Sequence, residues 1–251
     1  MKILFKSLGI LLIVTLGGIF LMITINSEKL PKGINQVEAE VVANKMLLAI
    51  NDSAWQKMGT VSWEYRNHEF IWDKERHLTQ VKFDAKEVLI DINARKGVIV
   101  KGGDGLSDDE KISLCNDAWK LWVNDSFWLN PISKCKDPGT VRKMVDLDDG
   151  RKGLMVSYES GGVTPGDSYV WILDENFRPV AWKLWVSIIP IKGIELTWGD
   201  WVQLKTGVWI ATSHEGLVSL PLSNPKGYTK LSDLTNGIDI FQSLGSAKIY
   251  F

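Results

Sequence analysis

Residues 61–83 read VSWEYRNHEFIWDKERHLTQVKF. Val61, Trp63 and Tyr65 alternate with polar side chains, and Glu69–Trp72 lead into the polar residues 73–76. After these, His77, Thr79, Val81 and Phe83 alternate again. Alternation with a period of two places every second side chain on one face of a strand, whereas a helix repeats every 3.6 residues. The segment therefore predicts a β-hairpin that gathers its aromatic side chains on one face.

Further strands are predicted on the C-terminal side of the hairpin. Gly, Pro, Asn and Asp separate short segments of alternating or apolar residues, as they do at tight turns. Short sequential strands favour an antiparallel meander over β-α-β units. The predicted strands are 86–93, 98–101, 141–147, 154–159, 168–173, 179–187, 194–204, 208–215 and 238–241.

Two helices are predicted between these strands. The first covers residues 35–51. Its expected buried face is a wide apolar stripe of Val37, Val41 and Leu48 on one flank with Val42, Met46 and Ala49 beside them. The second begins at Ser107-Asp108-Asp109-Glu110, which has the form of a capping box, and is expected to end by Asp125. The fold class predicted is therefore α+β and mainly antiparallel β.

The N-terminus predicts a membrane-targeting segment. Residues 8–25 are apolar apart from small residues, and as a helix they would span about 27 Å, close to the roughly 30 Å hydrocarbon core of a bilayer. Lys2 and Lys6 precede them, which holds the N-terminus in the cytoplasm and sends the rest across the membrane. Residues 1–33 are predicted as an uncleaved transmembrane anchor with its linker, or alternatively a cleaved signal segment, and residues 34–251 as one domain.

The composition restricts the partners and suggests a binding surface. With 29 basic and 30 acidic side chains among 251 residues, we expect no nucleic-acid partner. Twelve tryptophans exceed the five tyrosines and eight phenylalanines. A curved sheet could hold an apolar ligand against such side chains, or the side chains could fill the core themselves. The residues predicted to line an apolar concavity are Trp63, Trp72, Trp171, Trp182 and Trp209, with Thr164 and Asp167 in a loop at its rim.

The cysteines and histidines form no recognisable catalytic or metal-binding motif. Cys115 and Cys135 are predicted either to form a disulfide or to be two buried thiols. His68, His77 and His214 are scattered and have no metal-ligand spacing. A hydrolase that uses His214 with a nearby acid would lack a nucleophile motif. We therefore expect no catalytic residue, no metal and no cofactor.

Several short segments resemble a known family. They are Asn116–Trp119, Phe127–Pro131, Lys136–Gly139 and Gly162–Tyr169. Together with the order of elements, residues 34–241 resemble the LolA-like half-barrels, which are periplasmic lipoprotein and lipid carriers, and in particular uncharacterised bacterial envelope proteins of that fold. The resemblance implies a curved meander sheet, an incomplete barrel closed by helices, whose concave side receives acyl chains. No functional residue is carried over from it.

These observations lead to two functional hypotheses. The first is a single-pass protein of the bacterial inner membrane whose periplasmic domain holds a lipid, an acyl chain or a lipidated partner in the apolar concavity. If the signal segment is cleaved, the same domain is secreted to the periplasm. The second is a structural or interaction module of the cell envelope with a self-filled core, no small ligand and a protein partner.

Overall fold

The computed structural model describes residues 25–34, 37–160 and 165–251. The predicted anchor through residue 24, the start of the first predicted helix and Thr164 lie outside the described residues. In the part that is described, no helix combines the length and hydrophobicity needed to cross a bilayer.

The described elements are thirteen strands with four α-helices and two 3-10 turns. The helical elements are α2 (Val37–Ala49), α3 (Asp52–Lys57), α4 (Asp108–Leu129), η1 (Ile132–Lys134), α5 (Leu231–Thr235) and η2 (Gln242–Gly245). The strands are β1 (Thr60–Tyr65), β2 (His68–Asp73), β3 (Leu78–Phe83), β4 (Lys86–Asp91), β5 (Lys96–Lys101), β6 (Thr140–Asp146), β7 (Lys152–Tyr158), β8 (Ser168–Leu173), β9 (Pro179–Trp185), β10 (Ile194–Thr197), β11 (Gly199–Gln203), β12 (Trp209–Ser213) and β13 (Leu222–Tyr228).

The chain forms two compact units, each with its own main sheet. Of the described residues, the first unit comprises 25–34, 37–43, 136–160, 165–174 and 179–196, and the second comprises 44–135, 175–178 and 197–251. That residues 34–251 form one domain stays a prediction.

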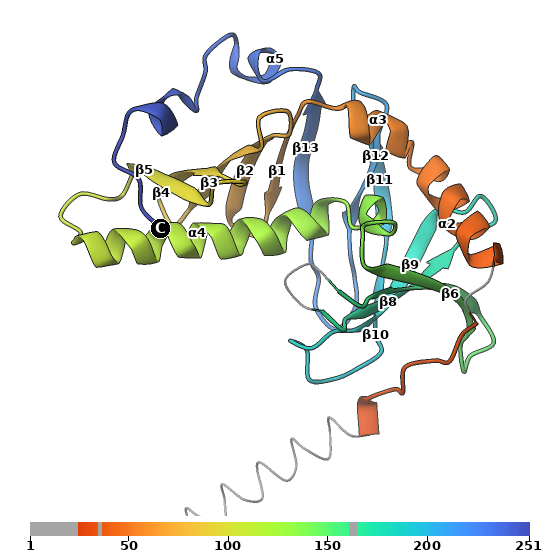
Figure 1. The fold of residues 1–251 in the computed structure, drawn as a ribbon. Coiled ribbons are helices and arrows are strands. Elements are labelled where there is room, and N and C mark those ends of the chain that lie inside the picture. Colours follow the sequence, from red (N-terminus) through yellow and green to blue (C-terminus); the bar gives the residue numbers. More distant parts are fainter. Residues whose placement is uncertain (1–24, 35–36, 161–164) are drawn as a thin grey trace, which may run out of the picture. The chain divides into compact units, whose positions relative to one another are not determined.

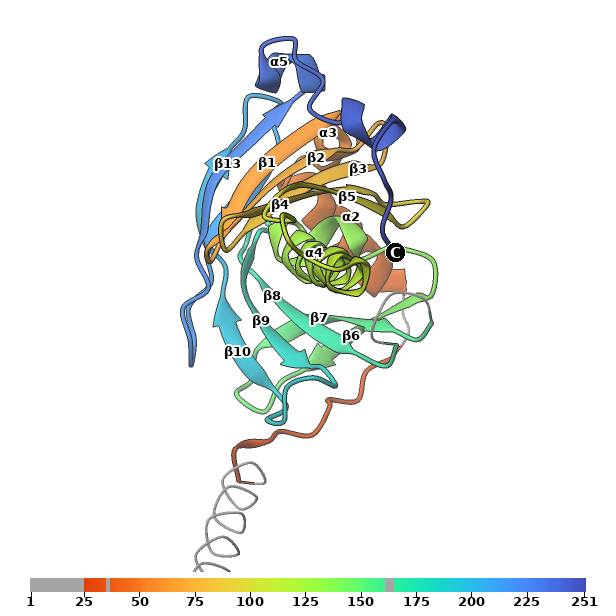
Figure 2. The same ribbon diagram turned by 90° about the vertical axis from the view of Figure 1, so that its left-hand side faces the viewer.

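The second unit is built on the hairpin predicted from residues 61–83. Its sheet has the order β13-β1-β2-β3-β4-β5, and its strands pair antiparallel. Trp63 lies opposite Phe70, and their rings stack with centroids 4.7 Å apart. Helix α4 lies along the aromatic face, against β3, β4 and β5 (Figures 1 and 2). The predicted turn at residues 73–76 and the aromatic face are confirmed. Residues 61–72, expected as one half of a hairpin, instead form two strands, because a turn at Arg66 (φ 56°) and Asn67 divides them.

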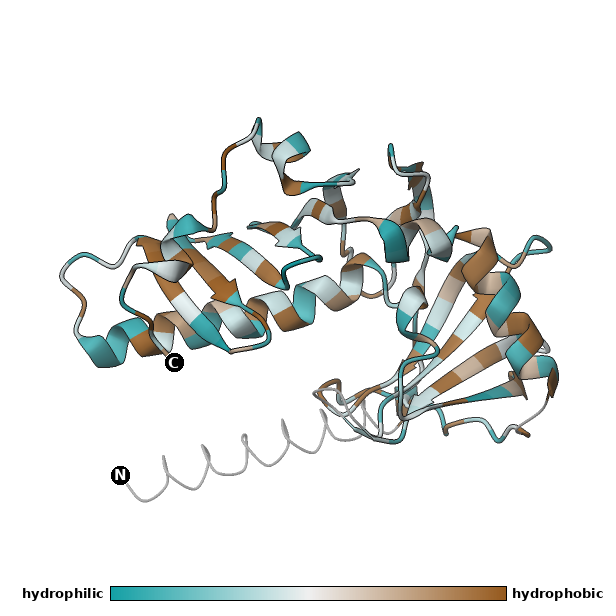
Figure 3. Cartoon of the chain, turned by 45° about the horizontal axis from the view of Figure 1, so that its top comes forward, coloured by the Kyte–Doolittle hydropathy of each residue, from teal (hydrophilic) through white to brown (hydrophobic). Residues whose placement is uncertain are grey.

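The first unit is an antiparallel meander of five strands, in the order β10-β9-β8-β7-β6. On one face, Glu40 of α2 forms ion pairs with Arg142 and Lys136. On the other face, residues 27–34 cross the sheet, since Gly33 packs against Val145. Neither main sheet closes into a barrel, and Figure 3 shows apolar segments in the strands of both. The predicted fold class, mainly antiparallel β with a few helices, is confirmed.

The buried face of α2 differs from the prediction. Val37 is 82% exposed and Leu48 is 77% exposed, whereas Ala39, Ala43 and Met46 are fully buried. Small alanine side chains let a helix approach its neighbours closely, so the alanine face packs although the valines are more hydrophobic. The predicted apolar stripe is therefore confirmed at Met46 but wrong at Val37 and Leu48, which are exposed.

Several element boundaries also differ from the prediction. Helix α4 continues through Asp125 to Leu129, because only Asn130, directly before Pro131, must leave the helical conformation. The predicted strand 194–204 is interrupted at Trp198, with Asp200 in a left-handed conformation (φ 51°). Residues 238–241 do not form a strand, and instead Phe241 packs with Leu89 and Leu231. Strand β13 escaped prediction because it contains Pro225, which is tolerated at the edge of a sheet.

Gly97 of β5 permits α4 to pack closely on the sheet, and this contact can be tested. A Cβ atom at residue 97 would lie 2.8 Å from Cys115 Sγ and 3.0 Å from Phe251 Cε2. We expect Gly97→Ala to lower the free energy of unfolding by about 1–3 kcal/mol in urea titrations, because overpacking forces neighbours to move. Adding Cys115→Ala removes the sulfur, so the free energy of unfolding should fall by less in the double variant than the summed losses of the two single variants. Additive losses would contradict this packing.

Candidate functional site

An aromatic wall lies on the inner face of the second unit. We define it as Trp63, Phe70 and Trp72 of the sheet together with Trp122 of α4. Trp63 and Trp72 share this face because Trp63 pairs with Phe70 and Val61 pairs with Trp72. The Trp122 ring meets the Trp72 ring edge-on, with centroids 5.8 Å apart. The structure therefore brings two of the predicted tryptophans together and adds a third from the helix.

The wall contains hydrogen-bond donors that are buried without acceptors. The indole N–H groups of Trp63, Trp72 and Trp122 have no hydrogen-bond partner among the residues that the structure describes. A buried donor left unpaired costs about 1–3 kcal/mol, so most buried donors in proteins are paired. The wall therefore offers both apolar ring surface and unused donors to a molecule with acceptor oxygens.

Trp209, also in the second unit, lies in a different environment. It is half-buried on β12, and the Arg178 guanidinium lies 4.4 Å from its ring centroid. Its backbone N–H donates to the Ile50 carbonyl. The contacts of Trp209 are thus cationic and backbone contacts, not contacts with the rings of the wall.

Trp171 and Trp182 belong to the first unit. They lie opposite each other on β8 and β9, with ring centroids 4.7 Å apart, and Tyr169 stacks on Trp182. Trp171 is 2% exposed and Trp182 is fully buried. The five predicted lining residues are therefore divided between the two units, and their role in binding a ligand stays a prediction.

The predicted rim residue Asp167 is part of the packed structure of the first unit. It is 3% exposed, and its carboxylate accepts the backbone N–H of Ser187 at 2.7 Å. This hydrogen bond ties the β7–β8 connection to the β9–β10 connection.

Both cysteines are fully buried, and no disulfide joins them in the structure. Cys115 faces β5, where its sulfur packs against Gly97. Burial raises the pKa of the Cys115 thiol to about 11, so the thiol is protonated at neutral pH. This arrangement corresponds to the second alternative from the sequence, two buried side chains.

A histidine–aspartate pair in the second unit was missed by the sequence reasoning. His68 Nδ1 lies 2.7 Å from a carboxylate oxygen of Asp125, which is 2% exposed. Burial raises the pKa of Asp125, and hydrogen bonds from Asn124 and His68 act in the opposite direction. One signal existed, because Asp125 occupies the position three residues after Trp122 on the buried face of α4. A carboxylate at such a position predicts a buried partner.

His214 is enclosed by aromatic rings. It is fully buried, and its ring centroid lies 4.1 Å from that of Trp198 and 5.8 Å from that of Trp128. Burial lowers the pKa of His214 to about 4, so the imidazole is neutral at neutral pH. These ring contacts supply no carboxylate to orient the imidazole as a catalytic base. Within the described residues, no group of three or more His, Cys, Asp or Glu side chains is arranged to hold a metal ion.

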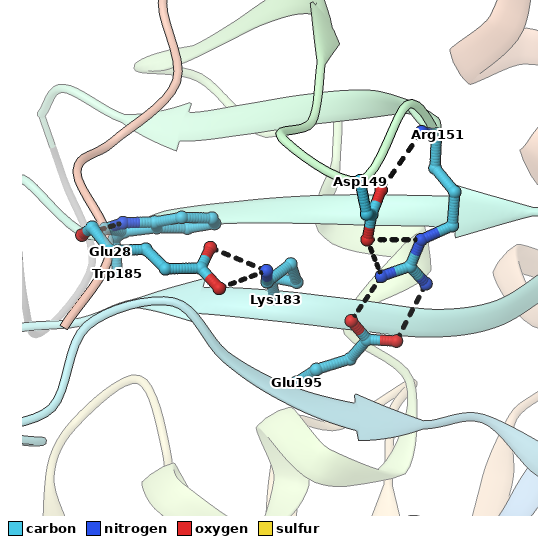
Figure 4. Close-up of polar contacts among 6 residues, drawn as sticks. All are labelled: Glu28, Asp149, Arg151, Lys183, Trp185 and Glu195. Atoms are coloured by element: carbon cyan, nitrogen blue, oxygen red, sulfur yellow. Dashed lines mark hydrogen bonds and ion pairs between the residues drawn. The ribbon is translucent and has the colours of Figure 1, made fainter. Parts of the chain in front are cut away.

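Residues 27–34, which we call the N-terminal strap, are fastened to the first unit (Figure 4). The Glu28 N–H donates to the Lys192 carbonyl at 3.0 Å, and the Glu28 carbonyl accepts the Trp185 indole N–H at 3.0 Å. Both oxygens of the Glu28 carboxylate lie 2.6 Å from the ammonium of Lys183, which is 7% exposed. At its other end, Ile34 pairs with Met144 at the edge of β6. The strap thus crosses the sheet and neutralises a buried lysine.

A second polar network lies near the strap. Arg151 holds Asp149 and Glu195 together, with nitrogen–oxygen distances of 2.5 and 2.6 Å (Figure 4). The Arg151 guanidinium lowers the pKa of Asp149 to about 2. This network joins the β6–β7 turn to β10. Lys183 forms its ion pair with Glu28.

Two shallow hollows lie on the surface of the second unit. Their volumes are about 170 and 250 Å³. The smaller touches Trp63 and Phe70 but is otherwise lined largely by polar side chains such as Glu64, Lys82 and Asn224. The larger lies at the β3–β4 turn among charged residues. Neither has the apolar lining that an acyl chain requires.

Comparisons with known proteins give structural matches only. No protein-family model matches the chain, and no curated protein matches it. The fold is similar to that of a DUF1329 family protein from Desulfovibrio piger, with 10% identity over 78% of this chain and 95% of that chain and a TM-score of 0.36. It is also similar to a putative outer membrane lipoprotein-sorting protein domain from Vibrio parahaemolyticus, with 10% identity over 77% of this chain and 97% of that chain and a TM-score of 0.32.

The Glu28–Lys183 ion pair can be tested by charge removal. We expect Glu28→Gln to lower the free energy of unfolding by about 1–3 kcal/mol, because it leaves the Lys183 ammonium buried without a full opposite charge. Combining it with Lys183→Met should recover part of the loss. Asp108→Asn, which breaks an exposed pair with Lys248, is the control and should leave the stability unchanged. Equal effects of Glu28→Gln and Asp108→Asn in chemical denaturation would contradict a buried ion pair.

The buried His214 predicts a loss of stability in acid. Because its pKa is about 4 in the folded chain, against 6.5 for an unperturbed histidine, the unfolded chain binds more protons between these values. Stability should therefore fall as the pH decreases from about 6.5 to 4, by up to about 3 kcal/mol from this group. The difference in stability between the wild type and His214→Phe at each pH isolates the contribution of His214, because the carboxylates titrate in both proteins. Parallel pH profiles of the two proteins in thermal unfolding would contradict the prediction.

Proposed function

We propose that this chain is a membrane-tethered protein of the bacterial cell envelope whose periplasmic part binds a lipid, an acyl chain or a lipidated partner. The aromatic wall of the second unit carries the proposal. Its three tryptophans place unpaired indole donors beside large apolar ring surfaces. Tryptophan is suited to ligands with one apolar and one polar end, because its ring is apolar and its N–H is a donor.

The donors narrow the chemical class of the ligand. A plain hydrocarbon would leave the N–H groups of Trp63, Trp72 and Trp122 unpaired. An acyl ester or a phospholipid carries carbonyl or phosphate oxygens that accept hydrogen bonds, so it would recover the cost of burying these donors. We therefore favour an acyl ester over an alkane. Helix α4 supplies Trp122 and covers the wall. A ligand can therefore enter only if α4 moves away from part of the sheet.

The tether is proposed from the apolar sequence 8–25 and from the strap. Glu28 follows Ile25 by only three residues, and a chain of that length spans about 10 Å at most. A strap fastened at Glu28 would therefore hold the first unit close to the bilayer. If the segment is instead cleaved, the protein is released into the periplasm with the same wall.

The role proposed is binding and not catalysis. The His68 imidazole contacts the Asp125 carboxylate and the rings of Phe70 and Phe83. These contacts bring neither a serine nor a cysteine nucleophile to the imidazole, and the ordinary role of such a buried pair is structural.

A second candidate function is an envelope interaction module without a small ligand. It is favoured by the burial of the tryptophans, since Trp63, Trp171 and Trp182 are at most 2% exposed. In each unit these rings pack on other side chains of the same unit. On this alternative, the exposed strand edges and apolar surface would recruit a protein.

Native mass spectrometry of the full chain, extracted from membranes in detergent, distinguishes the two functions. We expect a co-purifying mass that extraction identifies as an acyl-bearing lipid. Trp63→Phe with Trp72→Phe keeps an aromatic ring at each position, although a smaller one, and removes two donors, so it should lower lipid occupancy several-fold. Trp201→Phe, on β11, is the matched control and should not change occupancy. A clean apo mass that does not shift when phospholipids are added would favour the interaction module.

A further inference from the structure

The loop between β9 and β10 carries an apolar tip in the first unit. Residues 187–191 read SIIPI, Ile188 is 72% exposed, and Pro190 is exposed as well. The Lys192 ammonium donates to the carbonyls of Val186 and Ile189, at 2.5 and 2.8 Å, and fixes the base of the loop. The tip is therefore a formed structure that presents apolar side chains outward.

Hydrogen bonds place this loop beside the start of the strap. The Lys192 N–H donates to the Ser27 hydroxyl at 3.2 Å, and the Glu28 N–H donates to the Lys192 carbonyl at 3.0 Å. Ser27 follows Ile25, the last residue of the apolar sequence 8–25, by two residues. The loop base thus lies within about 7–10 Å of the end of that sequence.

The two ends of the sheet differ in polarity. In an antiparallel meander, the β9–β10 loop and the β6–β7 turn lie at opposite ends of the sheet. The β6–β7 turn carries exposed Asp148 and Asp149. The β9–β10 loop, which lies beside the start of the strap, therefore presents the apolar tip, and exposed Lys29 follows Glu28 on the strap.

We propose that residues 187–191 form a membrane-contacting loop, which inserts Ile188 into the interfacial region of the bilayer that anchors residues 8–25. This inference rests on the proposed membrane tether. The bilayer is the occupant that the connectivity selects, because a tether of two or three residues keeps the tip at the bilayer surface. Lys29 complements anionic headgroups there. Tether and loop together give the first unit two attachments, which fix its orientation on the membrane.

A label at the loop tip tests the proposal in the full chain. The chain is reconstituted in vesicles of phosphatidylethanolamine and phosphatidylglycerol at a ratio of about 3:1. Ile188→Cys is labelled with nitrobenzoxadiazole, and Asp148→Cys at the opposite end of the sheet is the matched control. Both positions are exposed, and the native cysteines are fully buried. We expect lipids with a shallow spin label to quench the label at residue 188 at least twofold more than the label at residue 148.

Flotation of the vesicles separates failure of the loop proposal from failure of the tether. If the chain floats with the vesicles but the labels at residues 188 and 148 are quenched equally, the loop does not contact the bilayer. This result would overturn the loop proposal and support the tether. If the chain does not float with the vesicles, the tether fails and the loop proposal fails with it. Flotation with selective quenching at residue 188 supports both.

Discussion

Antiparallel pairing of short strands gives each sheet an apolar face that must be covered, and the remaining elements are arranged to meet that need. In the second unit, the pairing of Trp63 with Phe70 assembles aromatic rings on one face. Helix α4 covers this face, and Gly97 lets the helix approach closely. In the first unit, α2 contacts one face and the strap crosses the other. The strap is therefore part of the fold and not a passive linker.

Two buried ionisable side chains of this protein meet partners from distant parts of the sequence. Glu28 neutralises Lys183 across 155 residues, and His68 meets Asp125 across 57 residues. Removal of Glu28 would leave the Lys183 ammonium in a poorly solvated position, and removal of His68 would leave the buried Asp125 carboxyl without this partner. Such pairs hold the strap and α4 in a defined register on their sheets, which apolar contacts alone specify less strictly.

The proposed lipid-binding wall and the proposed membrane-contacting loop assign different tasks to the two units. The second unit offers aromatic rings with unpaired donors, which suits a ligand having both acyl chains and oxygen acceptors. The first unit holds the strap and carries the apolar tip at Ile188. In this proposal the first unit attaches the protein to the membrane, and the second unit binds a lipid from it.

The amino-acid sequence by itself determined the antiparallel meander, the hairpin turn at residues 73–76 and the capping box at Ser107, because these depend on local periodicity and turn chemistry. It did not determine the additional turn at residues 66–67, which divides the first half of the predicted hairpin into two strands. Nor did it determine which side chains of α2 are buried: Ala39, Ala43 and Met46 are, whereas Val37 and Leu48 are exposed. Strand β13 was hidden by Pro225, which only an edge position tolerates. The Glu28–Lys183 and His68–Asp125 pairs, and the division of the five tryptophans between two units, were decided by the tertiary structure, because each depends on contacts between residues far apart in the sequence.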